Sequence, residues 1–138
     1  MQSLEIIKQY YACFNQKNWD GMLQLLHADI RHDVNQGSAR LGLEQYRKFL
    51  QHMELCYDEQ LKEMVFMPNA DGTRVACEFV VHGMYKHTDG DLPAANNQRY
   101  VLPAGAFLEL KEGKISRVTT YYNLPEWVRQ ISQGGARG

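Results

Sequence analysis

The sequence predicts an α+β domain in which helices pack on the concave face of a curved, cone-shaped sheet with mixed or antiparallel strands. The 138 residues suit one domain, with apolar residues at helical spacing up to about residue 56 and alternating apolar residues from about residue 60 onward. A strongly bent sheet cannot fill its own concave side with backbone. The space beneath the helices is therefore either packed core or a ligand pocket.

The first part of the chain is predicted to be helical with one short strand. Apolar residues at three- and four-residue steps indicate helices over residues 3–16, 19–28 and 43–56. Asn18 can cap the second of these helices. Between the second and third helices, "IRHDV" at 30–34 alternates as a short strand does, and turn residues follow it.

The second part of the chain is predicted to be sheet. Four strands are expected, at residues 60–67, 73–86, 99–110 and 114–123, with the turns "NADG" and "KEGK" joining two pairs of them. In the 73–86 strand, alternation puts Glu78 and His82 on the face opposite Phe79 and Val81. The pattern does not decide which of these faces is concave.

A polar segment interrupts the strands and a short helix closes the domain. Residues 87–98, "HTDGDLPAANNQ", predict a long exposed loop of the kind that often acts as a lid. Pro125 can start a helix that carries Trp127. We expect a single domain over residues 1–131 and a flexible C-terminal tail over residues 132–138.

Composition excludes several classes of function. Fifteen basic and sixteen acidic residues give a formal charge of −1 without a basic stripe, so nucleic acid is not an expected partner. No apolar run approaches the length of a membrane span, and the N-terminus lacks the pattern of a signal peptide. Three dispersed cysteines suit reduced thiols in a cytoplasmic protein. No two of the five histidines have metal-ligand spacing, so no metal site is expected.

The stretch "HDVNQGSARLG" has an acid, a turn, and then Arg and Gly at the offsets found in ketosteroid isomerases, here Asp33, Arg40 and Gly42. From Ile6 to Trp127 the chain resembles the nuclear transport factor 2-like (NTF2-like) superfamily, in its ketosteroid isomerase and SnoaL-like polyketide cyclase branch. The resemblance implies a cone-shaped, cystatin-like roll and a homodimer that associates through its sheet.

The resemblance also implies roles for single residues. Asp33 falls on the isomerase general base, Tyr10 on the tyrosine that donates to the substrate oxygen, and Tyr122 on an aromatic position that lines the pocket. Where the isomerases carry a second, protonated Asp in the oxyanion hole, this chain has Ala106 or Gly105. In ketosteroid isomerase that neutral Asp and a Tyr together stabilise the enolate oxygen.

Several further residues are predicted to bind substrate. His82 and Glu78 are candidates if their strand face lines the pocket, and Arg31 shares a strand face with Asp33. An alternative interpretation makes Arg31 a structural ion pair with Asp33 or with Glu78. The predicted substrate-binding set is Arg31, His32, Phe49, Glu78, His82, Tyr122 and Trp127.

These observations predict a small pocket enzyme that moves a proton next to a carbonyl of an apolar substrate, as ketosteroid isomerase does. A positioned base and hydrogen-bond donors suffice for enolate chemistry, so no cofactor is expected. The expected partner is a small apolar molecule. Two alternatives remain open: a noncatalytic binding module for an apolar metabolite, and a SnoaL-like cyclase or hydrolase.

Overall fold

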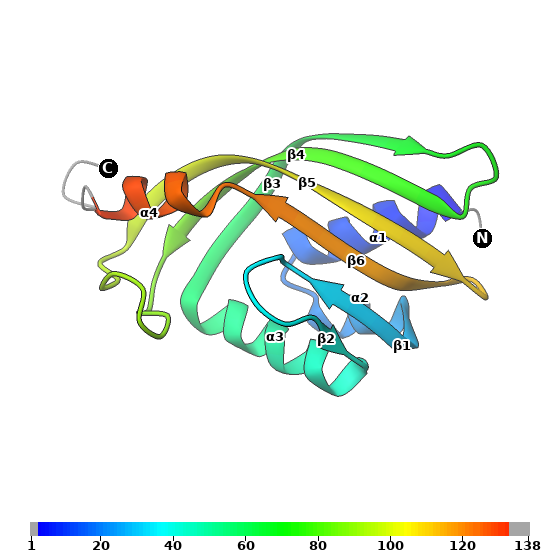
Figure 1. The fold of residues 1–138 in the computed structure, drawn as a ribbon, viewed down its shortest axis with the longest axis horizontal. Helices are drawn as coiled ribbons and strands as arrows, with labels where there is room; N and C mark the ends of the chain where they lie inside the picture. The colour runs from blue at the N-terminus through cyan, green and yellow to red at the C-terminus, as the bar shows by residue number, and fades with distance from the viewer. Residues whose placement is uncertain (1–2, 133–138) are drawn as a thin grey trace.

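The predicted α+β class is confirmed by the computed structural model, which describes residues 3–132 (Figure 1). The elements are α1 (Ser3–Asn15), α2 (Trp19–Gln24), β1 (Leu26–Asp33), β2 (Arg40–Leu41), α3 (Leu43–Cys56), β3 (Tyr57–Pro68), β4 (Arg74–Tyr85), β5 (Gln98–Lys111), β6 (Lys114–Tyr122) and α4 (Leu124–Ser132). The six strands form one sheet in the order β2-β1-β6-β5-β4-β3. Only the β1–β6 pair is parallel, so the sheet is mixed.

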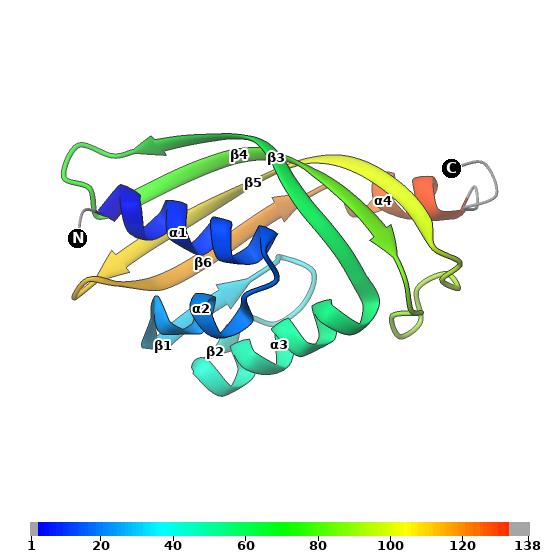
Figure 2. The same cartoon turned by 180° about the vertical axis from the view of Figure 1, so that it is seen from behind.

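The long strands β3 to β6 bend across the molecule, and α1, α2 and α3 lie against the concave face that the bend creates (Figures 1 and 2). Each of the two long helices, α1 and α3, turns an apolar side toward the sheet, with Ile7 and Leu50 almost fully buried. The helices cover the concave face of the sheet over much of its length. α4 packs against β5 beyond them, at one end of the sheet.

Burial along β4 decides which strand face is concave. Val75, Cys77, Phe79 and Val81 are buried beneath the helices. Glu78 lies on the other face and is exposed, and His82 shares that outer face. Inward side chains of this strand are therefore apolar, and the two polar candidates point away from the space under the helices.

Two predicted boundaries near residue 26 are wrong, for the same reason. The second helix ends at Gln24 rather than near residue 28, and the strand after it starts at Leu26 rather than at residue 30. The Ile115 N–H donates to the carbonyl of Leu25 at 2.9 Å, and Leu26 pairs with Ile115 across the sheet. Pairing with a distant strand thus overrides the local helical periodicity.

The segment predicted as an exposed loop is partly built into the domain. The hydroxyl of Tyr85 donates to the carbonyl of Pro93 at 2.7 Å and accepts from the N–H of Asp89 at 2.9 Å. Leu92 packs against the core. These contacts hold Asp89 at one end of the concave space.

α4 confirms the predicted closing helix and carries Trp127, which is buried. The Trp127 ring makes edge contacts with Tyr57, Tyr85 and Tyr100, at centroid distances of 6.0, 5.1 and 5.8 Å. Of the predicted tail, Ser132 ends α4, and residues 133–138 lie outside the described residues. None of the helices within residues 3–132 is long and apolar enough to cross a membrane.

We predict that Gly83→Ala destabilises the protein by about 1–3 kcal/mol, because an added Cβ would overlap the ring of Tyr100. Gly83 and Tyr100 are opposite each other on β4 and β5, and the tyrosine ring fills the space that glycine leaves. Urea unfolding measures the loss. Tyr100→Ala removes the overlapping ring, so Gly83→Ala should lower the free energy of unfolding by less in the Tyr100→Ala protein than in the wild type. Equal losses in the two proteins would contradict the explanation.

Candidate functional site

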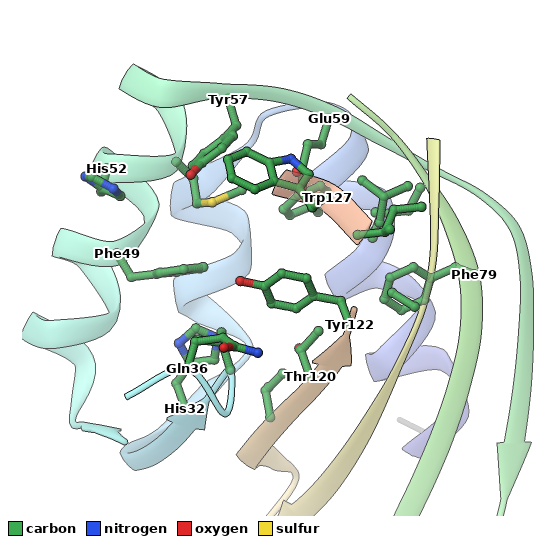
Figure 3. A pocket seen from close by; sticks show the side chains of 18 of the residues that line it. His32, Gln36, Phe49, His52, Tyr57, Glu59, Phe79, Thr120, Tyr122 and Trp127 are labelled. Carbon is green, nitrogen blue, oxygen red and sulfur yellow. The ribbon is translucent and has the colours of Figure 1, made fainter. Parts of the chain in front are cut away.

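A cavity of about 430 Å³ lies between the helices and the concave face of the sheet. This volume is typical of small-molecule binding sites. Ten aromatic residues line the cavity: Tyr10, Tyr11, Phe14, Tyr46, Phe49, Tyr57, Phe79, Tyr100, Tyr122 and Trp127. Figure 3 shows Glu59, Tyr57 and Trp127 toward one end, His32 and Gln36 toward the other, and Tyr122 between them. The wall is aromatic, with polar groups at both ends.

Glu59 places a carboxyl group in this aromatic wall. It follows Tyr57 on β3, and alternation turns both side chains into the cavity with Leu61. The Tyr100 hydroxyl donates to Glu59 Oε2 at 2.5 Å, and within residues 3–132 no hydrogen bond reaches Oε1. Burial raises the pKa of the Glu59 carboxyl, and the Tyr100 hydrogen bond opposes that rise. The free oxygen is thus available to accept a proton.

Asp89 brings a second carboxyl group to the same end. Its Oδ2 accepts from the Tyr57 hydroxyl at 2.5 Å, and its Oδ1 lies 2.9 Å from His52 Nε2. Cys56 Sγ is 3.9 Å from the same His52 nitrogen. Acid–base relays of the Cys-His-Asp type use both ring nitrogens of the histidine. Because one nitrogen serves both contacts here, the three groups do not form such a relay.

The same three residues are the ones that most resemble metal ligands. His52, Cys56 and Asp89 each offer one ligand atom, and these atoms lie within 4.8 Å of one another. The donor set is one that Zn²⁺ accepts. However, burial raises the pKa of the Cys56 thiol, which disfavours the thiolate that would bind a metal, and His52 and Tyr57 already satisfy both Asp89 oxygens. The local chemistry favours a hydrogen-bonded cluster over a metal site.

Two tyrosine hydroxyls face each other between α1 and α3. The hydroxyls of Tyr10 and Tyr46 are hydrogen-bonded, and both residues line the cavity and are almost fully buried. Burial raises the pKa of both phenols, so both remain protonated at neutral pH. One proton is used in the bond between them, and no other hydrogen bond to either hydroxyl exists within the described residues. The pair therefore has one O–H left to donate to a ligand.

His32 lies beside this pair and is only 3% exposed. Its ring packs on Tyr46 and Phe49, with centroid distances of 4.7 and 4.3 Å, and its Nδ1 is buried with no hydrogen-bond partner among residues 3–132. Burial lowers the pKa of His32 to about 4, and the positive charge of Arg40 adds to that effect. At neutral pH the imidazole is uncharged, so one of its nitrogens can donate a hydrogen bond and the other can accept one.

Tyr122 reaches from β6 into the middle of the cavity (Figure 3). Burial raises the pKa of its hydroxyl, the negative charges of Glu59 and Asp89 raise it further, and the positive charge of Arg40 opposes them. Charges at both ends of the cavity thus act on this one hydroxyl. A ligand in contact with Tyr122 would be within reach of both ends.

Five of the predicted site residues line the cavity, namely Tyr10, His32, Phe49, Tyr122 and Trp127, and four do not, namely Arg31, Asp33, Glu78 and His82. Glu78 and His82 lie on the outer face of the sheet, the alternative that alternation had left open.

Asp33 is not among the residues that line the cavity. Since neighbouring side chains alternate on β1, the inward position belongs to His32. Asp33 Oδ1 accepts from the N–H of Asn35 at 2.7 Å in a turn, and Oδ2 lies 3.9 Å from Arg31 Nη2. The alternative of an Arg31–Asp33 ion pair is confirmed. The structure does not bring Asp33 and Tyr10 together across the cavity.

Sequence reasoning missed Glu59, Tyr100, Asp89 and His52 as lining residues. The signal for Glu59 was present. The segment "YDEQL" alternates inward Tyr57, Glu59 and Leu61, but the strand had been predicted to begin at residue 60. Asp89 carried no such signal, because only the fold of its loop brings it to His52.

A family model and several solved structures match this chain. The family model described as a SnoaL-like domain matches residues 7–118. A candidate polyketide cyclase from Pseudomonas putida KT2440 is 49% identical, with a TM-score of 0.92 over 94% of this chain and 98% of the other. One from Xanthomonas campestris pv. campestris is 48% identical, with a TM-score of 0.90 over 94% and 96% of the two chains.

A more distant structure, an NTF2-like protein from Burkholderia xenovorans LB400, is 16% identical, with a TM-score of 0.76 over 93% of this chain and 94% of the other. It shares the fold of this chain, while the match to the SnoaL-like domain model confirms the predicted SnoaL-like resemblance. None of the curated proteins matches the chain.

We predict that His32 lowers stability in mild acid. Its folded pKa of about 4 lies below the ordinary value of 6.5, so between these pH values the unfolded chain binds a proton that the folded protein does not. The free energy of unfolding should therefore fall as pH drops from 6.5 to 4, by up to about 3 kcal/mol from this residue. NMR titration of the imidazole measures the midpoint directly.

The matched variants for this prediction are His32→Asn and His87→Asn. His32→Asn should flatten the pH dependence of urea unfolding, whereas His87→Asn should not, because His87 is exposed. A His32 midpoint near 6.5 would show that the ring is not desolvated as described.

Proposed function

This chain belongs to the SnoaL-like domain family, and we propose that it is an acid–base enzyme of the polyketide-cyclase kind. It removes a proton from the carbon next to a carbonyl of an apolar, ring-bearing substrate held in the aromatic cavity. The enolate then attacks a second carbonyl of the same molecule and closes a ring. The observation that carries the proposal is the Glu59 carboxyl, which lines this cavity with one oxygen that accepts no hydrogen bond from the described part of the chain.

Glu59 is the proposed general base in place of Asp33. A general base works best when its pKa lies near the operating pH, and burial moves the pKa of Glu59 in that direction. The Tyr100 hydroxyl fixes one carboxyl oxygen, which leaves the other oriented toward the cavity contents. Asp33 has an ion pair and a turn hydrogen bond instead, and it is not among the residues that line the cavity.

Hydroxyl groups are the proposed proton donors to the substrate oxygens. The Tyr10–Tyr46 pair has one O–H to spare, in keeping with the donor role predicted for Tyr10. The Tyr122 hydroxyl, in the middle of the cavity, can serve a second oxygen. A ring closure needs two such sites, one for the enolate and one for the carbonyl that becomes a hydroxyl. Preorganised donors and a base supply this chemistry, so the proposal includes no cofactor.

The active unit is proposed to be a homodimer. Exposed apolar side chains gather on the outer face of the sheet: Val65 and Met67 on β3, Val101 and Phe107 on β5, and Tyr121 on β6. Phe107 and Tyr121 are 45% and 49% exposed and make an edge contact at 5.6 Å. An exposed apolar patch of this kind is typical of an interface. A second copy of the same face would cover it.

We predict that the protein speeds hydrogen–deuterium exchange next to the carbonyl of 2-tetralone, a neutral bicyclic ketone, in deuterated buffer followed by NMR. Glu59→Gln should lower the exchange rate by about a hundredfold or more, since it removes the base. Glu63→Gln is the matched control, because Glu63 is exposed on the same strand and does not line the cavity. It should exchange as the wild type does.

Asp33→Asn in the same assay compares the two candidate bases. If Asp33→Asn lowers the exchange rate and Glu59→Gln does not, Asp33 is the base and the assignment of Glu59 is refuted. Binding of 2-tetralone without any enzyme-dependent exchange would favour the noncatalytic binding module.

We predict that Phe107→Glu yields a monomer in light scattering after size exclusion, while the wild type is a dimer. A charge buried at the centre of the apolar face should abolish association. Leu55→Glu changes a similarly exposed apolar residue on α3, on the opposite side of the sheet, and should leave the dimer intact. A monomeric wild type would refute the proposed homodimer.

A further inference from the structure

Arg40 is a cation in the cavity wall, and no carboxylate of residues 3–132 forms an ion pair with it. Five other arginines in the described residues lie within 4.0 Å of a carboxylate oxygen: Arg31, Arg47, Arg74, Arg117 and Arg129. Arg40 forms no ion pair and no side-chain hydrogen bond within residues 3–132, although it is half-buried and lines the cavity. A guanidinium has five N–H donors, and hiding them from water without acceptors is costly.

The groups around Arg40 carry no compensating charge. Its guanidinium lies over the ring of Phe49, 4.9 Å from the centroid, and it pairs across β1 and β2 with the neutral His32. The nearest acid along the turn, Asp33, pairs with Arg31 instead. The cation–π contact places the guanidinium against the aromatic wall, and its N–H groups have no hydrogen-bond acceptor within residues 3–132.

The positive charge of Arg40 acts on groups that line the cavity. It lowers the pKa of His32 and opposes the rise in the pKa of Tyr122, which is in the middle of the cavity. The opposite end carries the carboxyl groups of Glu59 and Asp89. The cavity is therefore positive at one end and acidic at the other, and an anionic ligand would be drawn to the Arg40 end and repelled from the Glu59 end.

We propose that Arg40 forms a subsite for a carboxylate, so that the substrate is an aromatic or polycyclic acid rather than a neutral ring compound. A carboxylate matches the fork of N–H donors, and the side-chain amide of Gln36, near His32 at this end of the cavity, can add a donor (Figure 3). The proposal rests on the proposed function. With its carboxylate on Arg40, the substrate would extend past Tyr122 and present its reacting carbon toward Glu59.

The test compares 1-naphthoate with 1-naphthamide, which has nearly the same shape but no charge. Each is titrated against the full-length protein by calorimetry. We expect naphthoate to bind at least about tenfold more tightly, the usual gain from a hydrogen bond to a charged group. Arg40→Gln should remove this preference by weakening naphthoate while leaving naphthamide unchanged. Arg40→Lys should keep part of the preference, since it keeps the charge but loses the fork.

Arg47→Gln is the matched control, because Arg47 pairs with Asp20 and does not line this cavity. It should preserve the preference for naphthoate. Unchanged naphthamide binding shows that a variant has kept its cavity. If Arg40→Gln fails to fold, the subsite is tested by the naphthoate preference of three other proteins. These are the wild type, Arg40→Lys and Arg47→Gln.

Three results would overturn the carboxylate subsite: equal binding of both compounds to the wild type, a preference that survives Arg40→Gln, or no binding of either compound. None of them bears on Glu59-dependent exchange of 2-tetralone, which is neutral. Failure of the subsite is thus distinguishable from failure of the proposed function.

Discussion

The packing of Trp127 against Tyr57, Tyr85 and Tyr100 is the contact on which the rest of the site depends. It ties the closing helix α4 to three neighbouring strands, and each tyrosine then uses its hydroxyl for a different purpose. Tyr100 donates to Glu59, Tyr57 donates to Asp89, and Tyr85 holds the 86–97 segment through Pro93. One apolar cluster therefore orients both carboxyl groups at this end of the cavity. Gly83 belongs to the same arrangement, since the absence of a side chain there makes room for Tyr100.

The cavity combines an apolar wall with opposite charges at its ends. Aromatic rings exclude water, which strengthens the electrostatic influence of the few polar groups that remain. Burial is the largest cause of the pKa shift at His32, Glu59 and Tyr122. A base with a raised pKa, protonated phenols and a neutral imidazole are the components of proton transfer at neutral pH. Their arrangement supports acid–base chemistry more than simple storage of a ligand.

Alternation predicted much of the sheet and some of the site. The strands after residue 60, the hairpin turns and the closing helix with Trp127 were all evident, because burial on one face of a strand or helix leaves a regular pattern. The same pattern placed Phe79 and Val81 together, and correctly opposite Glu78 and His82. On β1 the base was assigned by resemblance and not by alternation. His32 rather than Asp33 turns inward, and a difference of one residue changes which side chain meets the cavity.

The sequence alone determined the α+β class, the helical first part, the alternating strands and the likeness to the NTF2-like superfamily. Each of these depends on local periodicity or on short motifs that are visible in the chain. Only the tertiary structure decided which face of β4 is concave, that Glu59 and Asp89 share one end of the cavity, and that Arg40 has no anionic partner among the residues that the structure describes. These features depend on which distant strands pair and in which register. Local sequence patterns do not predict contacts between residues such as Glu59 and Tyr100, because these residues are brought together only by folding.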